Sequence, residues 1–498
     1  MNLSLSLDNI FLKFKNKNAI VIGKKKYKYD YLKKQSNQII EQFKNEKINT
    51  KDIILIFNNK NIEEFVMMIA CIRYGVIYAN IDPKLPSDRI RSIIKNLKPK
   101  IFFSKKFNKD ILKILDKKKI FKNKKFNKSI VSNKNNLSQN NPIYIIYTSG
   151  SSGAPKGVCV DNKNLISFIK WCKNKFNISS HDKITNLNPM YFDNSVFDFY
   201  NSIFNGATMV VFNENELKNT QLIMKILKKN RCTIWYSVPS LLIYCQNLRS
   251  FEMKKLFEVK KIIFAGEPYP KIKLYELFKK FSKKIQFFNA YGPTETTCLC
   301  SAHRVREIDF KTDTNLVTLG KLNDKNSIFK INILKKDSSS KINKGELHIG
   351  GDFVSQGYYN NSKLTLEKFY TKIIRNKRVR FYKSGDIVAK DAKGNFYFKG
   401  RSDNQIKIMG YRIEIEDIEM NINKLKYVKQ SCVLFNKQRE TGVLVAFVSV
   451  KNITSNKLIK DLKKLIPFYM IPKKIFMMEN LPFNRNGKID KNKLKKLL

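Results

Sequence analysis

The sequence has few of the residue patterns that build metal centres or disulfide frameworks. Its eight cysteines include no C-x-x-C pair, and its three histidines, His181, His303 and His348, lie far apart along 498 residues. Zinc sites and disulfide scaffolds usually show closely spaced groups of these residues. We therefore expect reduced, mostly buried thiols, and we assign none of the histidines a catalytic or metal-binding role.

Long apolar runs are also absent. The longest, EEFVMMIACIRYGVIYANI, is interrupted by charged residues before it reaches the roughly 18 residues that a membrane-spanning helix needs. Near the N-terminus, Asp8 lies where a signal peptide would have its apolar core, and no basic leader precedes it. We expect a cytoplasmic protein without stable membrane insertion.

Acidic residues are scarce, with 41 Asp and Glu against 96 Lys and Arg and a formal net charge of +55. The lysines are scattered amid Asn and Ile and form no single basic arm, and these three residue types share A/T-rich codons. No recognition-helix, zinc-finger or RNA-binding signature accompanies the charge. We therefore expect no nucleic-acid partner, although a basic surface would attract an acidic protein.

The length of the chain predicts two or more domains. From about residue 30 to 120, helical patterns alternate with short apolar runs, which predicts a parallel sheet with crossover helices. The alternation continues to about residue 320, and glycine-punctuated runs then indicate antiparallel β structure. After Asp403 the pattern is strand (IKIMGYRIE), helix, two strands, helix and strand. We expect an α/β protein with a large domain, residues 1–402, and a small α+β domain, residues 403–498.

The stretch IYTSGSSGAPKGVCV, residues 146–160, follows a predicted buried strand and is rich in glycine and hydroxyl side chains. It is no Walker A loop, because Lys156 follows Pro155 and precedes Gly157, and it is no G-x-G-x-x-G fingerprint. Accessible amides, hydroxyls and a cation nevertheless suit a polyphosphate. By itself the stretch could also be a linker. The predicted phosphate-binding residues are Thr148, Ser149, Gly150, Ser151, Ser152, Gly153 and Lys156.

Further motifs follow this loop in order along nearly the whole chain: NAYGPTETT, GELHIGGDFVSQGY, YKSGD, GRSDNQIKIMGYRIE and NRNGKIDK. Together with YTSGSSGAPKG they resemble the motifs of the adenylate-forming enzymes. The sequence is most similar to the amino-acid adenylation domains of that superfamily, in particular to the D-alanine:D-alanyl carrier protein ligases. The resemblance implies the adenylate-forming fold with a mobile C-terminal domain. It also implies that a carboxylate is joined to the ATP α-phosphate and the acyl group is then passed to a thiol.

The resemblance assigns the NAYGPTE motif to nucleotide binding. Tyr291 would stack on adenine with Asn289 beside its edge, and Thr294 would contact the α-phosphate. Glu295 would hold Mg²⁺, whose charge offsets the repulsion felt by the attacking carboxylate. The residues of this motif predicted to bind the nucleotide are Asn289, Ala290, Tyr291 and Gly292.

Later motifs supply the ribose contacts and the catalytic lysine by the same resemblance. Asp386 would accept both ribose hydroxyls, and Arg401 would add a ribose or phosphate contact. Lys488 would bridge the carboxylate and the α-phosphate during adenylation. Rotation at the hinge residue Asp403 would then withdraw Lys488 and present the strand around Gly410, whose missing side chain leaves room for a pantetheine arm.

The segment YFDNSVFDFY, residues 191–200, indicates the substrate class. Asp193 matches the aspartate that pairs with the α-ammonium of an amino acid, although a helix N-cap is the alternative for an Asp before an apolar helical pattern. Bulky Phe197 and Tyr236 indicate a small or medium uncharged side chain, such as that of alanine, and chirality stays open. The predicted side-chain pocket consists of Asn194, Phe197, Tyr236, Ile263, Ala265, Ala290, Cys298 and Leu299.

No carrier-protein segment is recognisable after Lys488, so the expected thiol belongs to the phosphopantetheine of a separate acidic carrier protein. The alternative within the superfamily is an AMP-forming acyl-CoA synthetase, which would have no use for Asp193. Alternatives of another class are a catalytically silent nucleotide-binding protein and a lysine-rich nucleic-acid binder. The presence of Lys488, Glu295 and Asp386 argues against a silent protein.

Overall fold

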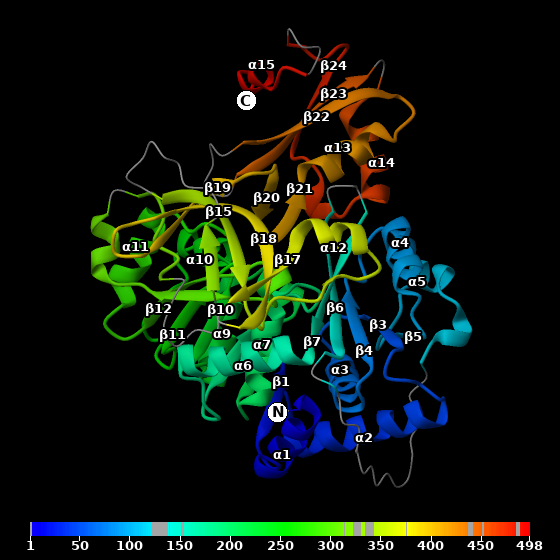
Figure 1. The fold of residues 1–498 in the computed structure, drawn as a ribbon, viewed down its shortest axis with the longest axis vertical. Coiled ribbons are helices and arrows are strands. Elements are labelled where there is room, and N and C mark those ends of the chain that lie inside the picture. The colour runs from blue at the N-terminus through cyan, green and yellow to red at the C-terminus, as the bar shows by residue number, and fades with distance from the viewer. Residues whose placement is uncertain are drawn as a thin grey trace.

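The computed structural model describes residues 2–121, 138, 140–150, 154–312, 314–321, 330–333, 343–374, 376–436, 442–450, 453–484 and 489–498, with only the backbone of 330–333 and 343. Two mainly parallel sheets and an antiparallel sheet form an N-terminal part, and a smaller C-terminal part lies above them (Figure 1). This arrangement confirms the predicted mixed α/β architecture.

The first sheet contains the alternation predicted for residues 30 to 120. Its strand order is β16-β7-β6-β4-β3-β5, and β3 to β6 run parallel. Its strands are buried on both faces, as crossover helices require. The elements are α2 (Tyr29–Asn45), β3 (Ile53–Phe57), α3 (Ile62–Tyr74), β4 (Ile77–Ile81), α4 (Ser87–Leu97), β5 (Ile101–Phe103), α5 (Lys109–Ile114), β6 (Pro142–Thr148), β7 (Lys156–Asp161) and β16 (Gly357–Tyr358).

The second sheet has the order β13-β12-β11-β10-β8-β9-β1-β2, with parallel strands from β12 to β1. Its strands are β1 (Asn18–Ile22), β2 (Lys25–Lys28), β8 (Lys183–Asn186), β9 (Thr208–Val211), β10 (Ile234–Ser237), β11 (Lys261–Phe264), β12 (Gln286–Tyr291) and β13 (Ser301–Arg304). Its helices are α1 (Leu3–Lys13), α6 (Asn162–Phe176), α7 (Asn194–Phe204), α8 (Glu214–Leu217), α9 (Thr220–Asn230), α10 (Pro239–Asn247) and α11 (Lys271–Phe281).

Antiparallel structure follows, as the glycine-punctuated runs predict. The third sheet pairs β14 (Lys330–Ile333), β15 (Asn343–Gly350), β18 (Lys377–Lys390) and β17 (Phe369–Ile374), with β19 (Phe396–Arg401) on β18 and α12 (Ser362–Lys368) beside it. The C-terminal part contains α13 (Ile415–Asn423), β22 (Val428–Asn436), β23 (Val443–Val450), α14 (Ser455–Leu465), β24 (Lys474–Met478) and α15 (Lys491–Lys495). The boundary between residues 402 and 403 stays a prediction.

One predicted element is wrong in detail. The single strand expected over IKIMGYRIE is a hairpin of β20 (Gln405–Ile408) and β21 (Tyr411–Glu414). Met409 and Gly410 both have positive φ, 51° and 79°, and such a pair turns the chain within two residues. Because the hairpin points its turn at the N-terminal part, it carries motif residues to the junction of the two parts (Figure 1).

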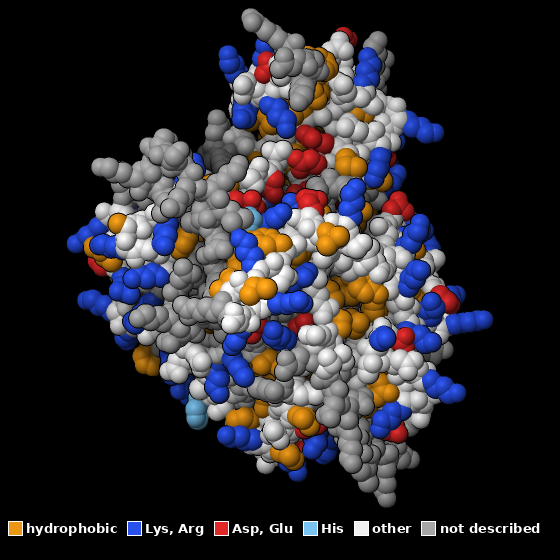
Figure 2. Space-filling model, viewed as in Figure 1, with side chains coloured by type: hydrophobic (Ala, Val, Ile, Leu, Met, Phe, Trp, Pro, Cys, Tyr) orange, Lys and Arg blue, Asp and Glu red, His pale blue; other side chains and the backbone are white. Residues whose placement is uncertain are grey.

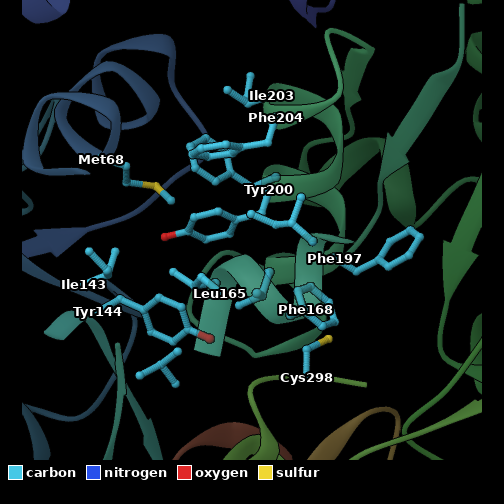
Figure 3. Packing of buried hydrophobic residues seen from close by; sticks show 14 of the residues in the cluster. Met68, Ile143, Tyr144, Leu165, Phe168, Phe197, Tyr200, Ile203, Phe204 and Cys298 are labelled. Carbon is cyan, nitrogen blue, oxygen red and sulfur yellow. The ribbon is translucent and has the colours of Figure 1, made fainter. Parts of the chain in front are cut away.

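Helix α7 anchors the site to the core between the two parallel sheets. All of its residues are buried. Figure 3 shows Tyr200 of α7 between Met68 of α3 and Tyr144 of β6, with Phe197 and Cys298 in the same cluster. Packing on every side fixes the helix, and with it the residues at its N-terminus.

The surface carries basic side chains spread over the face seen in Figure 2, with acidic side chains gathered where the two parts meet. All eight cysteines are free and buried, which confirms the expected reduced thiols. Among the described residues, no helix is long and apolar enough to cross a membrane.

Candidate active site

Two adjoining cavities lie where the carboxyl ends of the parallel strands meet the C-terminal hairpin. They have Gly266, Gly292, Asp386, Arg401, Gln405 and Lys407 in common. The first also contains Thr148, Ser149, Asp193 and Thr294 in its wall. The second, of ≈ 710 Å³, also contains Asn289, Ala290 and Tyr291. Motifs that are widely separated in the sequence therefore meet at one place.

The phosphate loop begins at the end of β6, at the carboxyl edge of the first sheet. Ser149 Oγ donates to the backbone oxygen of Arg412 over 2.7 Å, and Thr148 Oγ1 is buried without a hydrogen-bond partner in the described chain. Lys156 Nζ lies 3.9 Å from Glu295 Oε1, and burial together with the charge of Arg412 lowers its pKa to about 8. The predicted loop residues Ser151, Ser152 and Gly153 lie outside the described residues.

Glu295 is fully buried and already paired. Tyr358 donates to its Oε1 and Arg412 Nη1 to its Oε2, each over 2.7 Å. Burial alone would raise the pKa of Glu295, but the neighbouring charges of Arg412 and Lys156 lower it below its usual value. Among the described residues there is no group of three or more His, Cys, Asp or Glu that could hold a metal. With both oxygens engaged and cations beside it, Glu295 as arranged here does not fit Mg²⁺.

The predicted ribose-binding residues form one connected group. Tyr291 donates its hydroxyl to Asp386 Oδ2 and Arg401 Nη1 donates to Oδ1, each over 2.5 Å. Arg401 also donates to both oxygens of Asp403, over 2.6 and 2.7 Å. Asn289, in contrast, donates to the backbone oxygens of residues 317 and 318. The structure thus brings Tyr291, Asp386 and Arg401 together beside the predicted hinge.

Asp193 lies at the N-terminus of α7, but its side chain makes no capping hydrogen bond to the helix. Instead Thr294 donates its hydroxyl to Asp193 Oδ2 over 2.5 Å. Burial raises the pKa of Asp193, and the Thr294 hydrogen bond opposes that shift. The structure therefore gives no support to the helix-cap alternative, and it directs the carboxylate into the first cavity.

The eight predicted side-chain pocket residues are all buried. Tyr236 donates its hydroxyl to Asn194 Oδ1 over 2.8 Å, and the rings of Phe197 and Tyr236 are 4.4 Å apart between centroids. The sulfur of Cys298 lies 3.9 Å from the Tyr236 hydroxyl oxygen. The other four belong to one core cluster, which also contains Phe288 of β12: Ile263, Ala265, Ala290 and Leu299. Of the eight, Asn194 lies in the wall of the first cavity and Ala290 in the wall of the second.

The hairpin reaches the site from the C-terminal part. The Gly410 amide donates to Glu267 over 2.6 Å, and a Cβ added at Gly410 would lie 2.7 Å from Val238 Cγ1. Lys407 lies in both cavities, and burial lowers its pKa. Lys488, the predicted catalytic lysine, lies outside the described residues.

Several residues at the site were not predicted from the sequence. Lys407 and Arg412 belong to the quoted motif GRSDNQIKIMGYRIE, where they alternate with apolar residues, and Tyr358 ends the motif GELHIGGDFVSQGY. A charged residue alternating with apolar ones in a strand beside a glycine turn is the signal that could have found the first two. Glu267 has no comparable signal.

Fold and site together define an α/β enzyme whose polar site, at the carboxyl ends of parallel strands, is completed by a C-terminal hairpin. The chain belongs to the AMP-binding enzyme family, since the family model for AMP-binding enzymes matches residues 8–359 and that for their C-terminal domain matches residues 417–488. This membership confirms the resemblance to adenylate-forming enzymes.

Individual relatives extend the comparison over the whole chain. The D-alanine–D-alanyl carrier protein ligase of Bacillus licheniformis is 30% identical over 496 residues, which is 96% of this chain and 95% of the relative. The adenylation domain AlmE of Vibrio cholerae, solved with glycyl-adenosine-5'-phosphate, aligns at 20% identity and a TM-score of 0.83 over 100% of this chain and 98% of that chain. NpsA-ThdA, an artificially fused adenylation-PCP di-domain from Klebsiella oxytoca, aligns at 18% identity and 0.83 over 95% and 93%. These structures confirm the adenylation-domain fold.

Proposed function

We propose that the protein is an AMP-forming amino acid:carrier protein ligase. In the first step, a carboxylate oxygen of the amino acid attacks the α-phosphorus of ATP, the bond to the β-phosphate breaks and pyrophosphate leaves. In the second step, the thiol of a phosphopantetheine arm attacks the carbonyl carbon of the aminoacyl-AMP, the thiol proton is lost and AMP leaves. The thiol belongs to a separate carrier protein.

The observation that carries this proposal is that the Asp193 carboxylate faces the first cavity and is not used as a helix cap. It does not cap its own helix, and it lies in the wall of the first cavity with Thr294 and Phe192. A buried carboxylate is costly unless a cation or a donor meets it, and the α-ammonium of an amino acid is such a cation. A simple acyl group would leave the carboxylate with the Thr294 hydroxyl but without a cation.

D-Alanine is the amino acid we propose. The tight packing of Phe197, Tyr236 and Cys298 favours a side chain as small as a methyl group. The Bacillus licheniformis relative, 95% of whose length is aligned with this chain, is named a D-alanine–D-alanyl carrier protein ligase, and that name supports D-alanine in particular. The carrier protein is proposed on the same ground, and its acidic character rests on the net charge of +55 of this chain.

The remaining residue roles are proposals from the motifs. The loop from Thr148 to Lys156 would hold the phosphates, and Asp386 with Arg401 the ribose. Lys488 would bring a positive charge to the reacting carboxylate and α-phosphate, where it lowers the barrier. We propose Asp403 as the hinge and the boundary between a domain of residues 1–402 and one of 403–498. Rotation there would exchange Lys488 for the Gly410 turn.

Mg²⁺ is proposed as the companion of ATP, whose phosphate charge it would neutralise in part. Glu295 is its ligand by sequence motif, but Arg412 and Tyr358 hold both carboxylate oxygens in this orientation. Metal binding at Glu295 therefore requires the hairpin to leave. An enzyme that consumes ATP also suits the cytoplasm, which is where we place it.

The decisive experiment is amino-acid-dependent ATP–pyrophosphate exchange on the purified protein, with D- and L-amino acids and short-chain acids as alternative substrates. We expect exchange with D-alanine. Exchange with another amino acid alone would keep the reaction and change the substrate, whereas exchange only with simple acids would refute the role of Asp193. Transfer to free coenzyme A in place of a carrier would favour the acyl-CoA synthetase alternative.

A further inference from the structure

A buried ion pair joins the two parts of the molecule at the edge of the first cavity, whose wall includes Arg89. Arg89 of α4 donates from Nη2 to Asp417 Oδ2 of α13, and their side chains are 8% and 0% exposed. Asn421 Nδ2 donates to the other oxygen of Asp417 over 2.8 Å. The Met470 sulfur lies 3.4 Å from Arg89 Nη2. The pair is thus enclosed by side chains of the C-terminal part.

Each charge of a buried ion pair is stabilised mainly by its partner, because water cannot reach it. Removing water from two ions costs about as much free energy as their attraction returns, but removing one partner leaves the other buried and uncompensated. Because Arg89 precedes the hinge at Asp403 and Asp417 follows it, rotation there separates the two and returns both to water. The ion pair therefore belongs to one orientation of the C-terminal part.

That orientation is the one in which the hairpin occupies the site. The Gly410 amide donates to Glu267, Arg412 holds Glu295, and the rings of Tyr411 and Phe192 meet at 4.9 Å. In Figure 1 the hairpin points down to the N-terminal part, whereas α15 lies at the far end of the C-terminal part. By the proposed mechanism this arrangement serves thiol transfer.

We propose that Arg89 and Asp417 are positioning residues for thiol transfer, because their ion pair selects the orientation that presents the Gly410 turn. This inference rests on the proposed function, since it concerns the second step of that reaction. The contacts that their side chains make with each other, with Asn421 and with Met470 include none of the residues assigned to adenylation. Variants of the pair therefore separate the two half-reactions.

The test compares R89M, D417N and the double variant R89M/D417N. Transfer from supplied D-alanyl-AMP to pantetheine should fall about 100-fold in D417N, because the uncompensated Arg89 cannot lose its proton and the thiol-transfer orientation becomes rare. R89M should lose less, because Asp417 can take up a proton. D-Alanine-dependent pyrophosphate exchange should stay unchanged or rise in both. The double variant should recover at least about tenfold over D417N, because no charge is left buried.

The matched control is R73M, which removes a buried arginine paired with Asp8 inside the N-terminal part. It should lower thermal stability and change the two half-reactions by the same factor. A second readout is Förster transfer between dyes on K113C in α5 and K463C in α14. R89M and D417N should shift its distribution, and the double variant should restore it.

Unchanged thiol transfer and dye distance in D417N, or additive losses in the double variant, would overturn the inference. Absence of exchange with every amino acid in the unmodified protein would refute the proposed function instead. The dye distances would still report whether the pair sets the orientation, so the two failures are distinguishable.

Discussion

The carboxylate of Asp193 accepts a hydrogen bond from Thr294 and none from the backbone of its own helix. Position in the sequence could not separate a cap from a ligand-binding group, since both put Asp before an apolar helical pattern. Thr294, in the short 3-10 helix that follows β12, decides between them. The role of the Asp193 side chain is therefore set by a contact with a residue 101 positions away in the chain.

Substitution of Asp193 tests this contact. We expect D193N to raise the KM for the amino acid by about 10- to 100-fold, because a hydrogen bond between charged groups contributes about 1.5–3 kcal/mol. The KM for ATP should change less than about twofold. S195A, which alters a side chain on the same helix, serves as the control in pyrophosphate-exchange kinetics. Equal changes in both KM values would remove Asp193 from the substrate site.

Lys488 is the second test at this scale. We expect K488A to lower amino-acid-dependent pyrophosphate exchange by at least about 100-fold, because the loss of one preorganised charge costs about 2.7–4 kcal/mol in the transition state. Transfer from supplied aminoacyl-AMP to a thiol should persist. K491A, a lysine of the same C-terminal segment, is the matched control. Full exchange activity in K488A would contradict the assignment.

At the scale of the element, the β20–β21 hairpin shows what the local sequence pattern does not predict. Apolar alternation correctly indicates extended structure across IKIMGYRIE, but it gives one strand where the protein has two. The usual Asn-Gly or Asp-Gly signal of a tight hairpin is missing, and Met409 occupies the first left-handed position. Contacts of the turn with Glu267 and Val238 hold it there. Tertiary contacts have overridden the local preference of methionine.

The turn itself can be tested by G410A. The added Cβ would lie 2.7 Å from Val238 Cγ1, and a positive φ of 79° costs a residue with a Cβ about 1–2 kcal/mol. We expect thiol transfer to fall at least about tenfold and pyrophosphate exchange to change little. The double variant V238A/G410A removes the close contact and should recover part of the loss. A loss of pyrophosphate exchange with normal thiol transfer would contradict the assignment of the turn to thiol transfer.

At the scale of the whole molecule, packing of helices on the sheets buries all eight cysteine thiols. Cysteines spread from position 71 to 432 all lie inside cores of the sheets. Burial raises the pKa of Cys159 and Cys300 to about 12 and that of Cys432 to about 11. The thiolate is the reactive form, so folding suppresses reactivity at every one of them.

We therefore expect the native protein to react with a thiol reagent such as DTNB at pH 8 at less than about one site per chain. The same protein in guanidinium chloride should react at all eight cysteines. Absorbance of the released thiolate counts the sites, and glutathione provides the control rate. Fast reaction of one native thiol would contradict the burial of all eight cysteines.

The sequence by itself determined the layered α/β architecture, the antiparallel region and the order of the motifs, because periodicity and short motifs are local in the chain. It also identified Tyr291, Asp386 and Arg401, which the fold brings into hydrogen-bond contact. Only the tertiary structure decided which way Asp193 points, that IKIMGYRIE turns back on itself, and that Arg412 holds Glu295. Arg89 and Asp417, 328 positions apart, pair only because one orientation of the C-terminal part buries both. Such pairings depend on which surfaces exclude water together, and no local pattern records that.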